Sequence, residues 1–134
     1  MKYLLFLLTI ASLPVFGQNS APAGLDNMRT GPVYTVVQQA PKFKGDMNKY
    51  LVDNIKYPAI ERKTNVTGTV YISFVVNKDG SVSDAKVLKG VEKGPGLDAE
   101  ALRVVSAMPA WTPGMNDGKL VRVQYNLPIN FQLR

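Results

Sequence analysis

The sequence contains no cysteine and no histidine. Without cysteine there are no disulfides and no thiolate ligands, and without histidine there is no imidazole for metal binding or for proton transfer near neutral pH. Cys–His and Ser–His nucleophile systems are therefore excluded, which leaves only carboxylates, lysine and tyrosine for catalysis. We predict that the protein is not an enzyme and that it uses no cofactor and no metal ion.

The acidic residues have structural explanations that do not require a hydrolase. Asp79 belongs to the turn predicted at residues 77–80, where Asp-Gly tolerates a positive φ. Asp98 is predicted to cap a helix over residues 97–108, and Glu100 lies where a negative charge favours the start of that helix. These roles account for the carboxylates without catalysis.

Length and charge indicate one globular domain with small appendages. The chain has 134 residues, of which 46% are hydrophobic and 19% charged, and its net charge is +6. Several cations fall between residues 42 and 63, but no aromatic residues alternate with them as in nucleic-acid-binding segments. We interpret them as a solvated face and predict no nucleic-acid partner.

The N-terminus has the layout of a signal peptide. Lys2 is followed by an apolar run over residues 3–13, Pro14 ends it, and cleavage is expected after Gly17. The apolar run is short for a membrane span. Residues 1–17 are therefore predicted to direct export. The alternative is an uncleaved signal anchor. Residues 18–32 predict a flexible leader, and residues 33–134 the domain.

Hydrophobic periodicity predicts helices and strands that form one α+β, two-layer domain. A short strand is indicated at residues 33–37. The main elements follow in the order of a helix over 47–54 capped by Asp46, a short helix over 59–63, strands over 68–77 and 81–89, a helix over 97–108, and a strand over 121–134. Three antiparallel strands with helices on one face satisfy this pattern. Trp111 follows the last helix among apolar neighbours and is predicted to lie in the core.

The last fourteen residues give the clearest functional indication. Apolar residues alternate with polar ones from Val121 to Leu133, which predicts a long strand with one buried face. Pro128 lacks an N–H, so this strand is expected at the edge of the sheet. A long edge with unpaired backbone groups is a docking site for another extended chain. Binding, not catalysis, is the predicted function.

A series of landmark residues extends through residues 57–134. The landmarks are Tyr57-Pro58, Gly68 with its strand, Asp79-Gly80, Leu97-Asp98, Trp111 with Pro113-Gly114, and Pro128-Ile129 with Phe131. Together they resemble the C-terminal domain of TonB, the energy-transducing protein of Gram-negative bacteria. Residues 41–45 and residues 100–105 are similar to a Bacteroidetes-type branch. The resemblance implies that the domain lies in the periplasm, or faces it from an anchor in the inner membrane.

This resemblance implies a partner and a site. The TonB box of an outer-membrane TonB-dependent receptor would add as a strand beside the last strand, with inner-membrane motor proteins engaged indirectly. Such a module would be linked to energised transport across the outer membrane. The alternative is an exported envelope or scaffold module that uses the same edge for another protein or for a strand-exchanged homodimer. The expected partner-binding residues are Tyr57, Pro58, Val121, Arg122, Val123, Gln124, Tyr125, Asn126 and Leu127.

Overall fold

The computed structural model of the protein describes residues 28–133. The predictions for the signal peptide and for the first part of the leader lie outside these residues. Within them, no helix is both long and apolar enough to cross a membrane. The elements are β2 (Val33–Tyr34), α2 (Met47–Asn54), α3 (Ala59–Lys63), β3 (Gly68–Val76), β4 (Val82–Lys89), α4 (Pro95–Ser106), β5 (Gly114–Asn116) and β6 (Lys119–Phe131).

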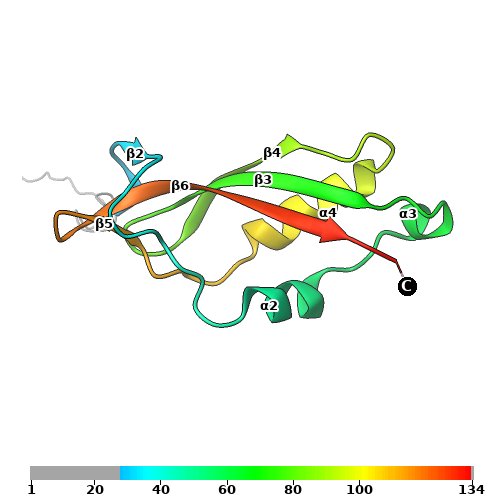
Figure 1. Cartoon of the computed structure of the whole chain (residues 1–134), viewed down its shortest axis with the longest axis horizontal. Coiled ribbons are helices and arrows are strands. Elements are labelled where there is room, and N and C mark those ends of the chain that lie inside the picture. The colour runs from blue at the N-terminus through cyan, green and yellow to red at the C-terminus, as the bar shows by residue number, and fades with distance from the viewer. Residues whose placement is uncertain (1–27, 134) are drawn as a thin grey trace, which may run out of the picture.

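The sheet is built around β3, which pairs antiparallel with β4 on one side and with β6 on the other. This arrangement confirms the predicted antiparallel core of three strands. Two short strands extend it: β5 forms a hairpin with the start of β6, and β2 pairs parallel with β6. The sheet is therefore mixed, with the order β2-β6-β3-β4, and β6 runs the length of the molecule (Figure 1).

The core lies between the sheet and α4. Val70, Ile72, Phe74 and Val76 alternate along β3 and are fully buried, as the period of two predicts. They meet the apolar stripe of α4 and the buried residues of β6. Trp111 is 1% exposed and its ring contacts those of Phe74 and Tyr125, which confirms its predicted place in the core. Burial of these side chains supplies the main driving force for folding.

Local signals set most element boundaries correctly. The Asp46 side chain accepts a hydrogen bond from the Lys49 N–H, which caps α2 at its predicted start. The predicted cap at Asp98 is wrong. Helix α4 begins earlier, after Gly94, because Pro95 is suited to the first helical position. The Asp98 carboxylate instead accepts from the Val91 N–H at 2.9 Å and so holds the loop before α4.

Candidate binding edge of the last strand

Strand β6 has two edges with different neighbours. One edge pairs with β3 in an unbroken register from Val123, opposite Val76, to Phe131, opposite Gly68. At Val123 the strand also pairs with Tyr34 of β2. Because Val123 has a partner on each side, β2 must lie on the second edge. Residues 119–121 pair with β5. The start of β6 is therefore already bordered by other strands.

From residue 124 to residue 131 the second edge has no strand partner among residues 28–133; we call this stretch the free edge. Pro128 pairs with Tyr71 of β3 without any break in register. A proline fits such a ladder only if its nitrogen faces away from the paired strand. Because backbone groups alternate between edges, the N–H groups of Asn126 and Asn130 point to the free edge as well.

The predicted docking stretch, residues 121–127, is thus only partly available. Residues 121–123 are paired with β5 or β2, whereas residues 124–127 belong to the free edge. Val121, Val123 and Leu127 have buried side chains, and by the same alternation the N–H groups of Val123 and Leu127 face β3, not the free edge. Tyr125 is half-buried and packs on Trp111, with 5.0 Å between ring centroids. Gln124 and Asn126 are exposed on the opposite face.

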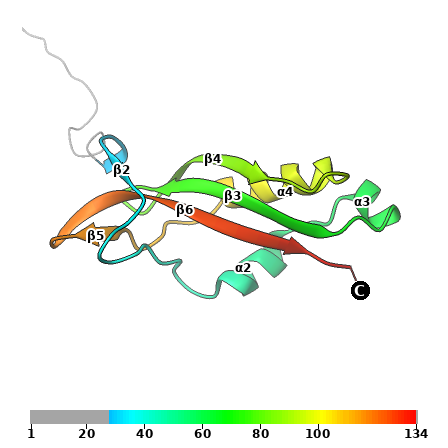
Figure 2. The same cartoon turned by 45° about the horizontal axis from the view of Figure 1, so that its top comes forward.

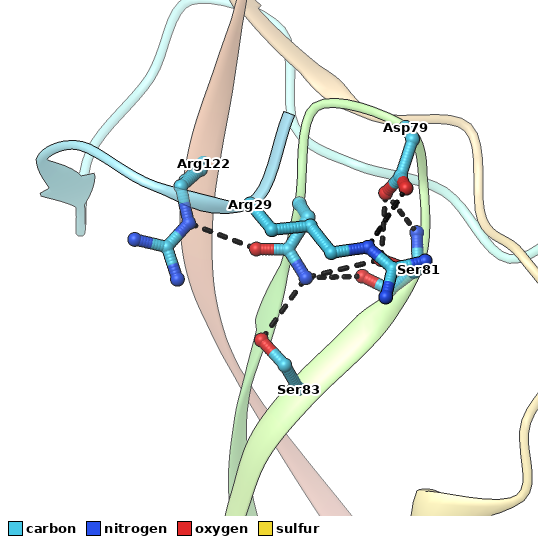
Figure 3. A network of polar contacts seen from close by, with 6 residues as sticks. Arg29, Asp79, Ser81, Ser83 and Arg122 are labelled. Carbon is cyan, nitrogen blue, oxygen red and sulfur yellow. Dashed lines mark hydrogen bonds and ion pairs between the residues drawn. The ribbon is translucent and has the colours of Figure 1, made fainter. Parts of the chain in front are cut away.

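Arg122 was expected to face a ligand or solvent, and this prediction is wrong. Arg122 is 9% exposed, and its Nε donates to the Oδ1 of Asn77 at 2.8 Å. Its Nη1 donates to the carbonyl of Gly31, also at 2.8 Å, and Nη2 lies 3.6 Å from the carboxylate of Asp84. The polar face of β6 is covered here by residues 29–31, which alternation along β6 alone does not reveal. Figure 3 shows this contact between β6 and the β3–β4 turn.

Asn77 connects Arg122 to the rest of this polar network (Figure 3). Its Nδ2 donates to the carbonyl of Ser81 at 3.1 Å and to Oγ of Ser83 at 3.0 Å. Asn77 is fully buried, so these bonds satisfy a side chain that would otherwise destabilise the fold. The network therefore fixes the β3–β4 turn against β6 at the place where β2 joins the sheet.

Asp79 attaches the end of the predicted leader to the same turn. Its Oδ2 lies 3.1 Å from Nε of Arg29, and its Oδ1 accepts from the N–H and the hydroxyl of Ser81. Burial alone would raise the pKa of Asp79, but the bonds from Ser81 and Arg29 together outweigh burial and hold this pKa below its usual value. Residues 28–31 of the predicted leader therefore contact the domain.

Helix α2 flanks the free edge of β6, on the side opposite β3 (Figures 1 and 2). Between them runs an open groove of about 370 Å³. Leu51 and Val52 of α2 and the following residue Ile55 line one wall of the groove, and Ile129 and Phe131 of β6 line the other. Asn48, Asn130 and Gln132 supply uncharged polar groups to the same groove, and Tyr57 and Pro128 complete the lining. A mostly apolar groove thus accompanies unpaired backbone groups.

Polar contacts with α4 hold α2 in place beside the edge. The Tyr50 hydroxyl donates to the carbonyl of Val104 at 3.1 Å. Arg103 donates through Nη2 to the carbonyl of Asn54, while Glu100 accepts from the Lys56 N–H at 2.7 Å. The middle and the C-terminal end of the helix are thereby fixed. The Arg103 hydrogen bonds, reinforced by that of Lys56 and opposed by burial, lower the pKa of Glu100.

Tyr57 and Pro58, although adjacent in sequence, lie in different surroundings. Tyr57 lines the groove, its ring packs edge-on against Phe131 at 5.8 Å, and its hydroxyl donates to the carbonyl of Val66. Pro58 is the residue before α3 and lies outside the groove, beside a separate depression next to the start of α4. The structure brings Tyr57 to the edge and leaves Pro58 away from it.

Sequence reasoning missed the groove because its two walls come from distant segments. The exposed apolar residue Val52 was the available signal: it is 79% exposed, on a helix whose other apolar residues pack against the core. Residues 128–132 were also omitted from the predicted site, although Pro128 itself had indicated the edge. The candidate site is therefore the free edge together with the groove.

The comparisons with known proteins agree with this fold. The family model for the Gram-negative bacterial TonB protein C-terminal matches residues 53–133, which is more than half of the chain. An NMR structure of the Helicobacter pylori TonB C-terminal domain is 25% identical, with a TM-score of 0.51 over 66% of this chain and 90% of that one. No curated protein matches the chain.

Two further solved structures are similar at lower TM-scores. A second structure of the Helicobacter pylori domain is 25% identical, with a TM-score of 0.48 over 65% of this chain and 77% of that one. The Pseudomonas aeruginosa TonB C-terminal domain is 24% identical, with a TM-score of 0.49 over 60% and 79% of the two chains.

Proposed function

The chain belongs to the family of Gram-negative bacterial TonB C-terminal domains, and we propose that it is a periplasmic module that binds an extended segment of an outer-membrane receptor by strand addition. The segment is the receptor's TonB box. It pairs with the free edge of β6 and links the module to energised transport across the outer membrane. The domain acts by binding and carries out no catalysis.

The free edge is the observation that carries this proposal. Residues 124–131 are held in extended form by β3, while their second edge lacks a strand partner within residues 28–133. Adding a strand there satisfies main-chain groups with little sequence preference, and side chains then supply specificity. The buried side chains of Leu127, Ile129 and Phe131 keep this part of β6 rigid, so binding needs little reordering.

An NMR titration of residues 18–134 with TonB-box peptides from the same genome tests the proposal. We expect saturable amide shifts at residues 124–131 and at Tyr57, which lines the adjoining groove. Scrambled peptides serve as controls for sequence. Shifts confined to β4 or to the loop before α4, far from the free edge, would contradict docking at β6.

The same edge also suits a second copy of the chain, since unpaired strand edges can pair with one another. Measuring the molecular mass across a concentration series separates this alternative. A dimer that persists in the presence of peptide, with no peptide shifts at the free edge, would favour an envelope or scaffold module over a receptor-binding one.

A further inference from the structure

The groove beside α2 has features that the free edge alone does not require. Val52 exposes 79% of its surface within this groove, whereas the similarly exposed Val36 and Ile60 do not line it. It lines the groove together with Leu51 of the same helix and Ile55, which directly follows the helix. The residues of β6 opposite them, Ile129 and Phe131, are buried in the core. The groove is therefore preformed and apolar.

The register of a strand on the free edge follows from the pleat. A residue of the added strand that lies directly opposite Ile129 has its side chain on the same face of the sheet as Ile129. The residue opposite Phe131 faces the same way, because strand side chains repeat every second position. Both side chains would point toward the groove, whereas the residue between them, opposite Asn130, would point to solvent.

We propose that the groove between α2 and β6 holds two apolar side chains of the added strand, at positions separated by one residue. This inference rests on the proposed function and extends it, because it names the kind of segment that the site selects. The segment is extended and carries no charge at the two inward positions. It tolerates polar residues at the outward positions.

The chemistry of the lining supports that choice. All the groove residues of α2 and β6 are apolar or carry uncharged amides, and none of the groove-lining residues is charged. A charged side chain in the groove would lose hydration without gaining an ionic partner. An apolar side chain would cover Val52 and remove its exposed surface from water. The groove would therefore select the side chains of the added strand, whereas the free edge alone recognises only its main chain.

Two capped peptides that match the length of the free edge test the inference by fluorescence anisotropy. One alternates Val with Thr and the other alternates Ser with Thr, and both carry the same terminal Lys and fluorophore. We expect the Val-containing peptide to bind at least about tenfold more tightly than the Ser-containing one. The difference combines burial in the groove with the greater preference of Val for extended backbone, so protein variants are needed to assign it to the groove.

Protein variants locate the effect. Val52→Asp should weaken binding of the Val-containing peptide by about tenfold and change binding of the Ser-containing peptide by less than about twofold. Val52→Leu should retain tight binding. Val36→Asp is the matched control, because Val36 is 83% exposed and does not line the groove. Since both positions are exposed, neither substitution removes a core contact.

Each outcome decides between the proposals. If both peptides bind wild-type protein equally, or if Val52→Asp leaves the preference unchanged, the groove is not used and the inference is overturned, while strand addition stands. If neither peptide binds, strand addition to this edge fails and the inference fails with it. A preference that is lost in Val52→Asp and retained in Val36→Asp supports both.

Discussion

Tyr34 of β2 is paired with Val123 of β6, on the edge of β6 that β3 leaves open. This contact marks the start of the free edge, because no strand of the described residues borders β6 on that side beyond it. The polar contacts of Arg29 and Gly31 hold the segment before β2 in place. The first strand of the domain, β2, therefore limits how much of β6 a partner can reach.

The first prediction concerns the main chain of the free edge. Asn126→Pro removes an N–H that faces the edge, and Pro128→Ala restores one. We expect Asn126→Pro to weaken peptide binding by about fivefold and Pro128→Ala to strengthen it by a similar factor, since one backbone hydrogen bond contributes roughly 1 kcal/mol. Peptide titration followed by fluorescence anisotropy measures both.

Asn126→Ala is the control for this pair, because it removes the exposed side chain and keeps the N–H. Main-chain recognition predicts little change in affinity for this variant. If Asn126→Ala weakened binding as much as Asn126→Pro, side-chain recognition would be the correct description.

The second prediction concerns the buried guanidinium of Arg122. Arg122→Ala leaves the Oδ1 of Asn77 and the carbonyl of Gly31 without their donors. We expect the free energy of unfolding to fall by about 2–3 kcal/mol, as is usual when buried polar groups lose charged partners. Urea denaturation measures the change. Lys119→Ala, an exposed cation on the same strand, should change stability by less than about 0.5 kcal/mol.

The third prediction concerns the turn between β3 and β4. Gly80 has φ +85°, and a Cβ there would lie 2.0 Å from the carbonyl oxygen of Trp111. Gly80→Ala therefore adds a steric conflict with the backbone to a backbone strain of roughly 1–3 kcal/mol. Gly45→Ala is the matched comparison, since Gly45 has φ +105° and open space around it.

We expect Gly80→Ala to lower the thermal midpoint clearly more than Gly45→Ala. The N–H of Trp111 donates to the carbonyl of Gly80 at 2.7 Å, so the turn cannot move away without losing this bond. Equal shifts in the two variants would mean that only the backbone strain matters and that the turn relaxes around the new methyl group.

The fourth prediction concerns pH. The pKa of Glu100 is lowered from 4.5 in the folded protein, so its ionised form is favoured by folding. This stabilisation is present in full above the unfolded-state pKa and is lost as the pH falls through the lower folded-state value. The stability difference between wild type and Glu100→Gln should therefore shrink between about pH 6 and about pH 3.

Urea midpoints across this pH range measure that difference. Glu92→Gln removes the same charge from an exposed position in the loop before α4 and serves as the control. A wild-type advantage over Glu100→Gln that stayed constant down to about pH 3 would show that the Glu100 contacts with Arg103 and Lys56 do not depend on its ionisation.

The family assignment and the predicted binding function came from different kinds of signal. Landmark residues from Tyr57 onward identified the family, and the matched family model confirms this recognition. The placement in a Bacteroidetes-type branch stays a prediction. The docking edge was inferred from the alternation of β6 and from Pro128. These signals located the strand but not the neighbours that occupy its first residues.

Local sequence by itself determined the elements whose causes are local. Alternation specified β3 and β6, Asp46 specified the start of α2, and Asp79-Gly80 specified the hairpin turn, because each signal lies within a few residues of its effect. The start of α4 was misjudged because Asp98 and Pro95 both suit a helix start, and the Val91 N–H used the carboxylate of Asp98.

Tertiary structure alone decided the features that join distant segments. The sequence indicates a short strand at residues 33–37, but only the structure shows that Val33–Tyr34 pairs with β6. Arg122 is buried because Asn77, 45 positions earlier, and Gly31, 91 positions earlier, meet its guanidinium. The groove exists because contacts with α4 hold α2 beside β6. The alternation of β6 thus determined that this protein has a long last strand with one buried face, and packing between remote segments decided which part of its second edge is free.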